Sequence, residues 1–93
     1  MTPAGSNPSS KRRDKLFIIA EILEIAKEGT LKTQIMYRAN LSHRQLEKYL
    51  NFLEANGMLI QVLRDDVRMF QVTEKGIEFL KEYERISGYL TPH

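Results

Sequence analysis

The chain of 93 residues is 42% hydrophobic and 28% charged, carries a formal net charge of +2 and contains no cysteine. These values indicate one small domain with a modest core, consistent with a partner subunit, and exclude a disulfide framework or a thiolate metal site. The longest apolar run, residues 16–20, cannot span a membrane, and residues 1–10 hold no signal-peptide core. We therefore expect a cytoplasmic protein without a membrane segment.

Positive and negative charges are segregated along the chain. Residues 11–15 carry four cations and one carboxylate, and cations recur between Lys32 and Lys48. The carboxylates gather at residues 21–28 and 74–84 instead. Segregation of this kind favours an oriented polyanion partner, whereas chance clustering on solvated helix faces is the alternative.

The first segment is predicted to be a disordered arm, residues 1–10, followed by a helix. Between them lies a basic cluster, Lys11, Arg12 and Arg13, for which we predict contacts with DNA phosphates or the minor groove. A solubilising helix start is the alternative, although cations at a helix N-terminus are electrostatically disfavoured. Over residues 14–27 apolar side chains recur with helical spacing in two stripes: Leu16, Ile19, Leu23 and Ala26, and Ile18, Ile22 and Ile25. We expect one stripe to face the core and the other the last helix or a second subunit.

Two helices and a tight break are predicted next. A connector at residues 28–31, expected to include a one- or two-residue strand, leads to a short helix over residues 32–39. The chain breaks at Asn40-Leu41, and a longer helix covers residues 43–56 with Ser42 and Gln45 as a capping box. Two helices joined by so short a turn form a helix-turn-helix unit, whose second helix can enter a DNA major groove.

The longer helix has one apolar and one polar side. Leu46, Leu50 and Leu53 are expected inward, together with Tyr49. The opposite side carries Arg44, Lys48 and Asn51, flanked by His43. Arginine and lysine can donate to guanine and asparagine can pair with adenine, so we predict DNA contacts here. An ordinary amphipathic helix with mixed charges is the alternative. On the short helix the outward residues are Gln34, Tyr37 and Arg38, and Arg38 adds to the basic residues of this region.

A hairpin and a final helix complete the predicted order. Residues 58–64 and 67–72 read as strands around an Asp65-Asp66 turn. Arg64 and Arg68 flank the tip and are predicted to contact phosphates or the minor groove, although the two carboxylates oppose this and leave the role open.

Thr73 is expected to cap the last helix, which runs from Glu74 to about Ser87 and ends at Gly88. This helix carries more large apolar groups than a lone surface helix needs. They either seal the core against the first helix or form a dimer seam. The predicted dimer interface is Ile18, Ile22, Phe79, Tyr83, Ile86 and Leu90.

The predicted fold class is mainly α with a small β-hairpin (α+β). The order helix, short strand, helix, helix, two strands, helix is that of a winged helix-turn-helix, in one domain over residues 11–90 with a tail at 91–93. The segments KTQIMYRANLSHRQLEKYLNFLEANGMLI and FQVTEKGIEFL resemble the small archaeal winged-helix regulators typified by the ten-kilodalton Sulfolobus DNA-binding proteins. The resemblance covers about Lys15 to Tyr83.

This resemblance implies a DNA-binding dimer held by an antiparallel coiled coil of long C-terminal helices. It also implies that Gln34, Tyr37, Arg44 and Lys48 lie at the DNA face. The chain departs from the pattern, because its last helix is predicted to have about fourteen residues before Gly88. A compact dimer or a monomer is therefore expected.

An enzyme is not expected, because the sequence has no P-loop, no glycine-rich nucleotide fingerprint and no metal-ligand spacing. We predict a transcriptional regulator that binds double-stranded DNA as a homodimer and needs no cofactor. Helix 43–56 would read the major groove, while the arm and the hairpin hold phosphates. The alternative is a winged-helix module that binds another protein and no DNA.

Overall fold

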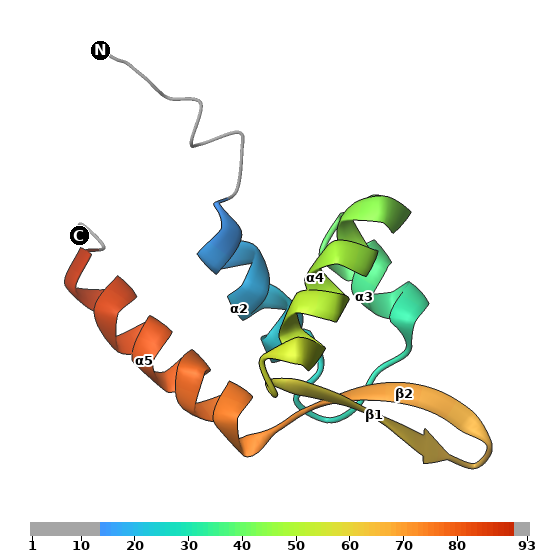
Figure 1. Cartoon of the computed structure of the whole chain (residues 1–93). Helices are drawn as coiled ribbons and strands as arrows, with labels where there is room; N and C mark the ends of the chain where they lie inside the picture. Colours follow the sequence, from blue (N-terminus) through green and yellow to red (C-terminus); the bar gives the residue numbers. More distant parts are fainter. Residues whose placement is uncertain (1–13, 91–93) are drawn as a thin grey trace.

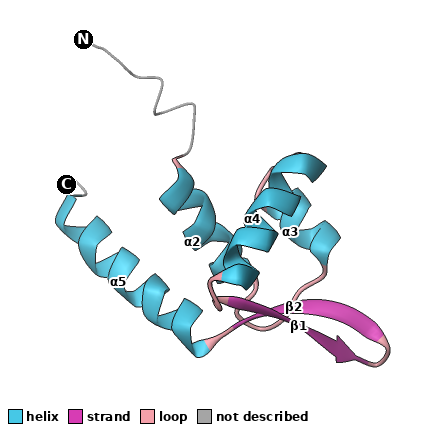
Figure 2. Cartoon of the chain, viewed as in Figure 1, coloured by secondary structure: helices cyan, strands magenta, loops and turns pink. Residues whose placement is uncertain are grey.

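The computed structural model describes residues 14–90, which fold into a group of helices and one hairpin (Figure 1). In chain order the elements are α2 (Lys15–Ile25), α3 (Lys32–Arg38), α4 (His43–Ala55), β1 (Leu59–Arg64), β2 (Val67–Val72) and α5 (Glu74–Leu90). Helix α2 stands between α5 and the α3–α4 pair, and the hairpin extends beneath them (Figure 2). This arrangement confirms the predicted fold class, mainly α with a small hairpin in winged helix-turn-helix order.

Helix α2 is the centre of the core because both of its apolar stripes face inward. Ile22 and Leu23 are fully buried, and Ile18 and Ile19 are nearly so. The helix contacts α3 on one side and α5 on the other. Ile18 and Ile22, which the sequence pattern assigned to a dimer interface, are therefore core residues of one chain and are not available to a second copy. Leu16, at the first turn, is exposed instead of buried.

The helix-turn-helix is fixed by local hydrogen bonds and by its buried leucines. Ser42 Oγ accepts from the backbone N–H of Gln45 at 3.1 Å, and Gln45 Oε1 accepts from the Ser42 N–H at 3.0 Å, which confirms the capping box. Asn40 turns the chain between α3 and α4 with a φ of 56°. At the other end of α4, Gly57 has a φ of 74°, a left-handed conformation that commonly ends a helix and that glycine adopts without strain. Side chains buried along α4 are Leu46, Leu50 and Leu53.

The hairpin is antiparallel, with Leu59 opposite Val72 and Arg64 opposite Val67. Its turn, Asp65-Asp66, has φ values of 53° and 65°, as a two-residue turn that follows the twist of the strands requires. The expected strand in the connector is one residue long. Thr30 donates to Phe70 O at 3.0 Å and accepts from the Phe70 N–H at 2.8 Å, which ties the connector to β2.

Helix α5 is longer than its sequence suggested. Thr73 Oγ1 accepts from the Gly76 N–H at 3.1 Å, so the predicted N-terminal cap is present. The predicted end at Gly88 was wrong, since α5 continues through it to Leu90 and has 17 residues. A glycine within a helix costs only about 1 kcal/mol relative to alanine, which does not suffice to end the helix. The predicted tail, residues 91–93, lies outside the described residues.

Candidate nucleic-acid interface

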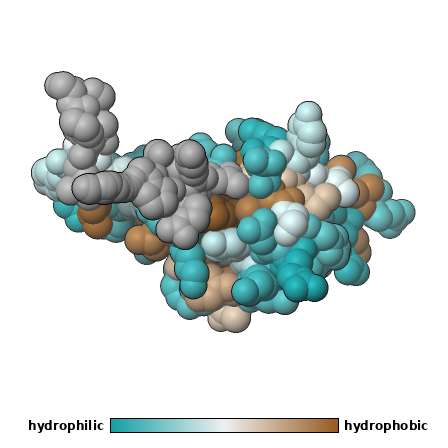
Figure 3. Space-filling view, turned by 90° about the horizontal axis from the view of Figure 1, so that it is seen from above, coloured by the Kyte–Doolittle hydropathy of each residue, from teal (hydrophilic) through white to brown (hydrophobic). Residues whose placement is uncertain are grey.

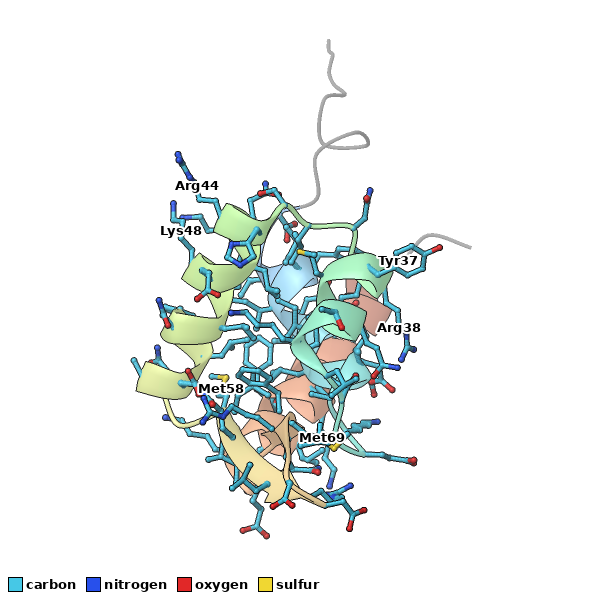
Figure 4. All side chains as sticks on the ribbon, turned by 90° about the vertical axis from the view of Figure 1, so that its right-hand side faces the viewer. Tyr37, Arg38, Arg44, Lys48, Met58 and Met69 are labelled. Carbon is cyan, nitrogen blue, oxygen red and sulfur yellow. The ribbon has the colours of Figure 1, made fainter. Side chains whose placement is uncertain are left out.

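The outward side of α4 carries two cations and an amide. Arg44, Lys48 and Asn51 are all exposed, because the buried leucines turn the opposite side of the helix to the core. Arg44 and Lys48 extend away from the helix in the same direction (Figure 4). Within residues 14–90, neither side chain has a hydrogen bond or an ion pair. These are the features that a phosphate- or base-contacting surface requires.

A carboxylate beside this surface is paired with a lysine and lies near a histidine. The Lys32 ammonium on α3 donates a hydrogen bond to Glu47 Oε2 on α4, and His43 Nε2 lies 3.8 Å from the same oxygen. The hydrogen bond from Lys32 holds the pKa of Glu47 below its ordinary value, against the opposing effect of desolvation. The negative charge of Glu47 is therefore offset by the ammonium of Lys32. The ammonium of Lys32 is in turn engaged by Glu47. The same carboxylate is a partner for His43 when the imidazole is protonated.

The predicted residues of α3 do not join Arg44 and Lys48. In Figure 4, Tyr37 and Arg38 extend from α3 on the other side of the view from Arg44 and Lys48. Tyr37 is 86% exposed. Arg38 instead lines two hollows that also contain carboxylates: Glu21 and Glu24 of α2, Glu84 of α5, and Glu28 of the connector. The grouping of Arg38 with the cations of α4 was therefore wrong. Helical periodicity predicts that Arg38 points away from the core side of α3, but it does not predict which neighbouring element its side chain approaches.

Gln34 has a structural role that the sequence pattern did not show. Its Oε1 accepts from the Leu31 N–H at 3.2 Å and from Thr30 Oγ1 at 2.9 Å. These bonds satisfy groups at the start of α3, where backbone N–H groups lack partners within the helix. The side-chain carbonyl is thus engaged, and a DNA contact by Gln34 would use the amide nitrogen.

The two arginines of the hairpin differ in their surroundings. Arg64 turns back towards the connector, with Nη1 at 3.5 Å from Glu28 O and Nη2 at 3.4 Å from Gln71 Oε1. Arg68 is exposed and has no such bond within residues 14–90. Of the two hairpin arginines, Arg68 is therefore the one whose guanidinium is not engaged by described residues. The remaining basic candidates, Lys11, Arg12 and Arg13, lie outside the described residues.

A groove beside α4 was missed by sequence reasoning. It encloses about 550 Å³ between α2 and α4 and is lined by Lys15, Ile19, Gln45, Lys48, Tyr49, Asn51 and Phe52. Phe52 is 51% exposed there, although the helical pattern gave it no role. The sequence feature that could have indicated this groove is Phe52, a large aromatic residue outside the apolar stripe of an amphipathic helix.

The C-terminal half of α5 exposes apolar side chains. Phe79 and Tyr83 are half-buried and stack with ring centroids 6.3 Å apart. Further along, Ile86 is 51% exposed and Tyr89 is 77% exposed. Leu80, by contrast, is buried, so α5 covers the core at Leu80 and leaves its later apolar residues exposed. The predicted dimer residues Phe79, Tyr83 and Ile86 thus lie along one accessible helix. Leu90 is the last residue of that helix, and only its backbone is described.

The described part of the chain contains neither a membrane-spanning helix nor a cluster of metal ligands. No helix there has the length and apolar character needed to cross a membrane. Within residues 14–90, no group of three or more histidine, aspartate and glutamate side chains is placed to hold a metal ion.

Comparisons with known proteins agree with this architecture. A family model described as winged helix-turn-helix matches residues 12–90. Two uncharacterized proteins of Methanocaldococcus jannaschii are relatives. One is 41% identical over 78 residues, covering 80% of this chain and 76% of that protein. The other is 34% identical over 84 residues, covering 89% of this chain but only 38% of that protein.

Two solved structures share the fold. Sso10a-2, a DNA-binding protein from Sulfolobus solfataricus, superposes with a TM-score of 0.70 at 26% identity, covering 84% of this chain and 85% of that one. This similarity confirms the resemblance to the small archaeal regulators. BpsR from Bordetella bronchiseptica has a TM-score of 0.67 at 13% identity, covering 88% of this chain and 60% of that one, and shows the fold alone.

Proposed function

This chain belongs to the winged helix-turn-helix family, and we propose that it binds double-stranded DNA through α4 as a transcriptional regulator. The observation that carries the proposal is the position of Arg44 and Lys48, which have no partner within residues 14–90, on the outward side of the second helix of the helix-turn-helix. The description of Sso10a-2 as DNA-binding supports it.

In this mechanism α4 enters the major groove with its N-terminal half foremost. Arg44 and Lys48 can donate to guanine O6 and N7 or to phosphates, and Asn51 can pair bidentately with adenine. The Ser42 cap and the buried leucines hold α4 rigidly, so these side chains reach the groove with little loss of backbone entropy. Sequence preference would come from these three residues.

Phosphate contacts would fix the position of the domain on the duplex. We assign them to Arg68 on the hairpin and to Lys11, Arg12 and Arg13 before α2, with a smaller contribution from Arg64. His43 and Tyr37 are exposed and remain candidate contacts at the ends of the two helices. Contacts of this kind set affinity and salt dependence but carry no sequence information directly.

We further propose a homodimer through α5. The exposed apolar side chains of its C-terminal half, together with its 17-residue length, support a helix-to-helix seam. Two copies on one duplex would present their α4 helices about 34 Å apart, one turn of the double helix.

A binding titration against random-sequence and genomic duplexes at several salt concentrations tests the proposal. We expect log Kobs to fall linearly with log salt, with a slope of about −0.9 for each phosphate neutralised. Tighter binding to particular genomic fragments than to random sequence would support a regulator. Absence of duplex binding at low salt would refute the proposed function.

The hairpin favours a second candidate function, binding to another protein. Leu63 is 70% exposed, and Ile60 and Val67 are nearly half exposed, while the tip carries the carboxylates Asp65 and Asp66. An apolar ribbon with an acidic tip suits a protein surface better than a phosphate backbone. Failure to bind any duplex, together with specific capture of one protein that Leu63→Lys abolishes, would establish this alternative.

A further inference from the structure

The groove between α2 and α4 has the size of a small-molecule site. Its volume of about 550 Å³ falls within the range of roughly 300–1,000 Å³ that such sites occupy in proteins. Figure 3 shows hydrophobic surface bordered by hydrophilic side chains on the face seen from above. The groove lies on the α2 side of α4, whereas the Lys32–Glu47 pair lies on the α3 side.

The lining of the groove combines an apolar wall with two cations. Ile19, Tyr49 and Phe52 supply the apolar and aromatic surface, and Phe52 remains half exposed in the free chain. Lys15 and Lys48 supply the positive charge, and within residues 14–90 neither ammonium has a hydrogen-bond or ion-pair partner. Among the described residues that line the groove there is no carboxylate. An anion with a flat apolar body complements both features.

The hollow on the other side of α2 has the opposite charge. Between α2 and α5, the lining includes carboxylates from both helices, Glu21, Glu24 and Glu84, with Arg38 as its one cation among the described lining residues. An anion entering that hollow would meet like charges, which is unfavourable at short range. Of these two hollows, the one beside α4 is the one that suits an anionic ligand.

We propose that the groove between α2 and α4 binds a small amphipathic anion of the aromatic carboxylate class. The ring would pack against Tyr49 and Phe52, and the carboxylate would lie within reach of Lys15 and Lys48. Lys48 and Asn51 line the groove and also belong to the proposed DNA surface, so ligand and DNA exclude each other. This competition rests on the proposed function, whereas binding to the groove does not.

The test of the groove is an NMR titration of the full chain with 2-naphthoate, with 2-naphthylmethanol as the uncharged control of the same shape. We expect saturable shifts of the backbone amides around Tyr49 and Phe52, and much weaker binding of the alcohol. Lys15→Gln should raise Kd about threefold, as the loss of one exposed charge contact implies. Phe52→Ala should raise it about fivefold. Lys81→Gln, an exposed lysine on α5, is the matched control and should leave Kd unchanged.

Spectra of the unliganded variants show whether the fold is retained, because amides distant from the substitution should not move. Equal affinity for naphthoate and the alcohol, or unchanged binding by Lys15→Gln and Phe52→Ala, would overturn the proposed site. Shifts that grow with protein concentration instead of naphthoate would assign the groove to a second copy and also overturn it. Saturating naphthoate should weaken duplex binding at least threefold, and unchanged binding would refute the competition. A chain that binds no duplex refutes the proposed function, while the naphthoate titration still decides the groove.

Discussion

The Lys32 ammonium on α3 donates a hydrogen bond to the Glu47 carboxylate on α4. The two residues are 15 positions apart, and their contact joins the two helices of the helix-turn-helix at its surface. The ammonium of Lys32 also offsets the negative charge of Glu47 at the edge of the proposed DNA surface. The pair therefore connects the stability of the motif with its electrostatic character.

Glu47→Gln should lower the stability of the domain modestly at pH 7 and leave it unchanged in acid. The pKa of Glu47 is held below its ordinary value, chiefly by the hydrogen bond from Lys32. A carboxylate whose pKa is depressed in the folded state stabilises it above the unfolded pKa, and this contribution disappears as the pH falls through the folded pKa. Urea denaturation of both proteins at pH 7 and near pH 3 measures the difference.

Glu78→Gln is the matched control, because this exposed carboxylate lies on α5 and has no ion pair within the described residues. Its stability should follow that of the natural chain at both pH values. A Glu47→Gln deficit of equal size at both pH values would show that the pair does not act through the ionised carboxylate.

Removing both free cations of α4 should abolish most duplex affinity. In Arg44→Gln/Lys48→Gln, each lost base contact costs about 1–3 kcal/mol, and each lost phosphate contact flattens the salt slope by about 1. Salt-dependent titrations of a single duplex distinguish these two contributions. The double variant Lys75→Gln/Lys81→Gln, with two exposed lysines of α5, changes net charge equally and should bind nearly as well as the natural chain. Equal losses in both variants would mean that only overall charge matters.

The order of elements followed from local patterns, and the structure confirms it for that reason. Helical periodicity, the Ser42–Gln45 capping box and the Asp65-Asp66 turn each depend on residues a few positions apart. The predicted limits of α4 and of the hairpin therefore agree closely with the structure. Gly88 shows the limit of this reasoning, because a glycine near a helix end is compatible with both a cap and a continued helix.

Contacts between elements could not be predicted from the same patterns. Ile22 was expected at a second subunit because α2 has two apolar stripes, yet α2 is packed on both sides within one chain. Arg38 and Arg64 are outward on their own elements, but one lies among carboxylates and the other turns back to the connector. The pairing of Lys32 with Glu47 depends on how α3 and α4 cross, which periodicity does not determine.

A lysine in the exposed apolar surface of α5 should weaken self-association. Ile86 is half exposed, and a charge placed at the centre of a seam would be desolvated without a partner. We expect Ile86→Lys to raise the dimer dissociation constant at least tenfold in sedimentation equilibrium. Leu63→Lys, an equally drastic change at the more exposed hairpin position, should leave association unchanged. Only monomer in the natural chain at high concentration would refute the dimer itself.

The two glycines of α5 should respond in opposite directions to alanine. A Cβ at Gly76 would lie 2.5 Å from Val72 Cγ2 and 2.6 Å from Met58 O, a backbone atom that also accepts from the Thr73 N–H. Since neither contact can relax without moving the end of the hairpin, Gly76→Ala should destabilise the domain by about 1–3 kcal/mol. A Cβ at Gly88 meets nothing within 4 Å.

Gly88→Ala should therefore stabilise the domain by about 0.5–1 kcal/mol, because alanine loses less backbone entropy within a helix. Thermal denaturation at a fixed protein concentration measures both changes, since 1 kcal/mol shifts Tm by about 4–8 °C in a domain of this size. A lower Tm for Gly88→Ala would indicate that Gly88 ends the helix in a left-handed conformation, as its sequence position first suggested. An unchanged Tm for Gly76→Ala would mean that the junction between the hairpin and α5 is loosely packed, in conflict with the close approach of Met58 and Val72.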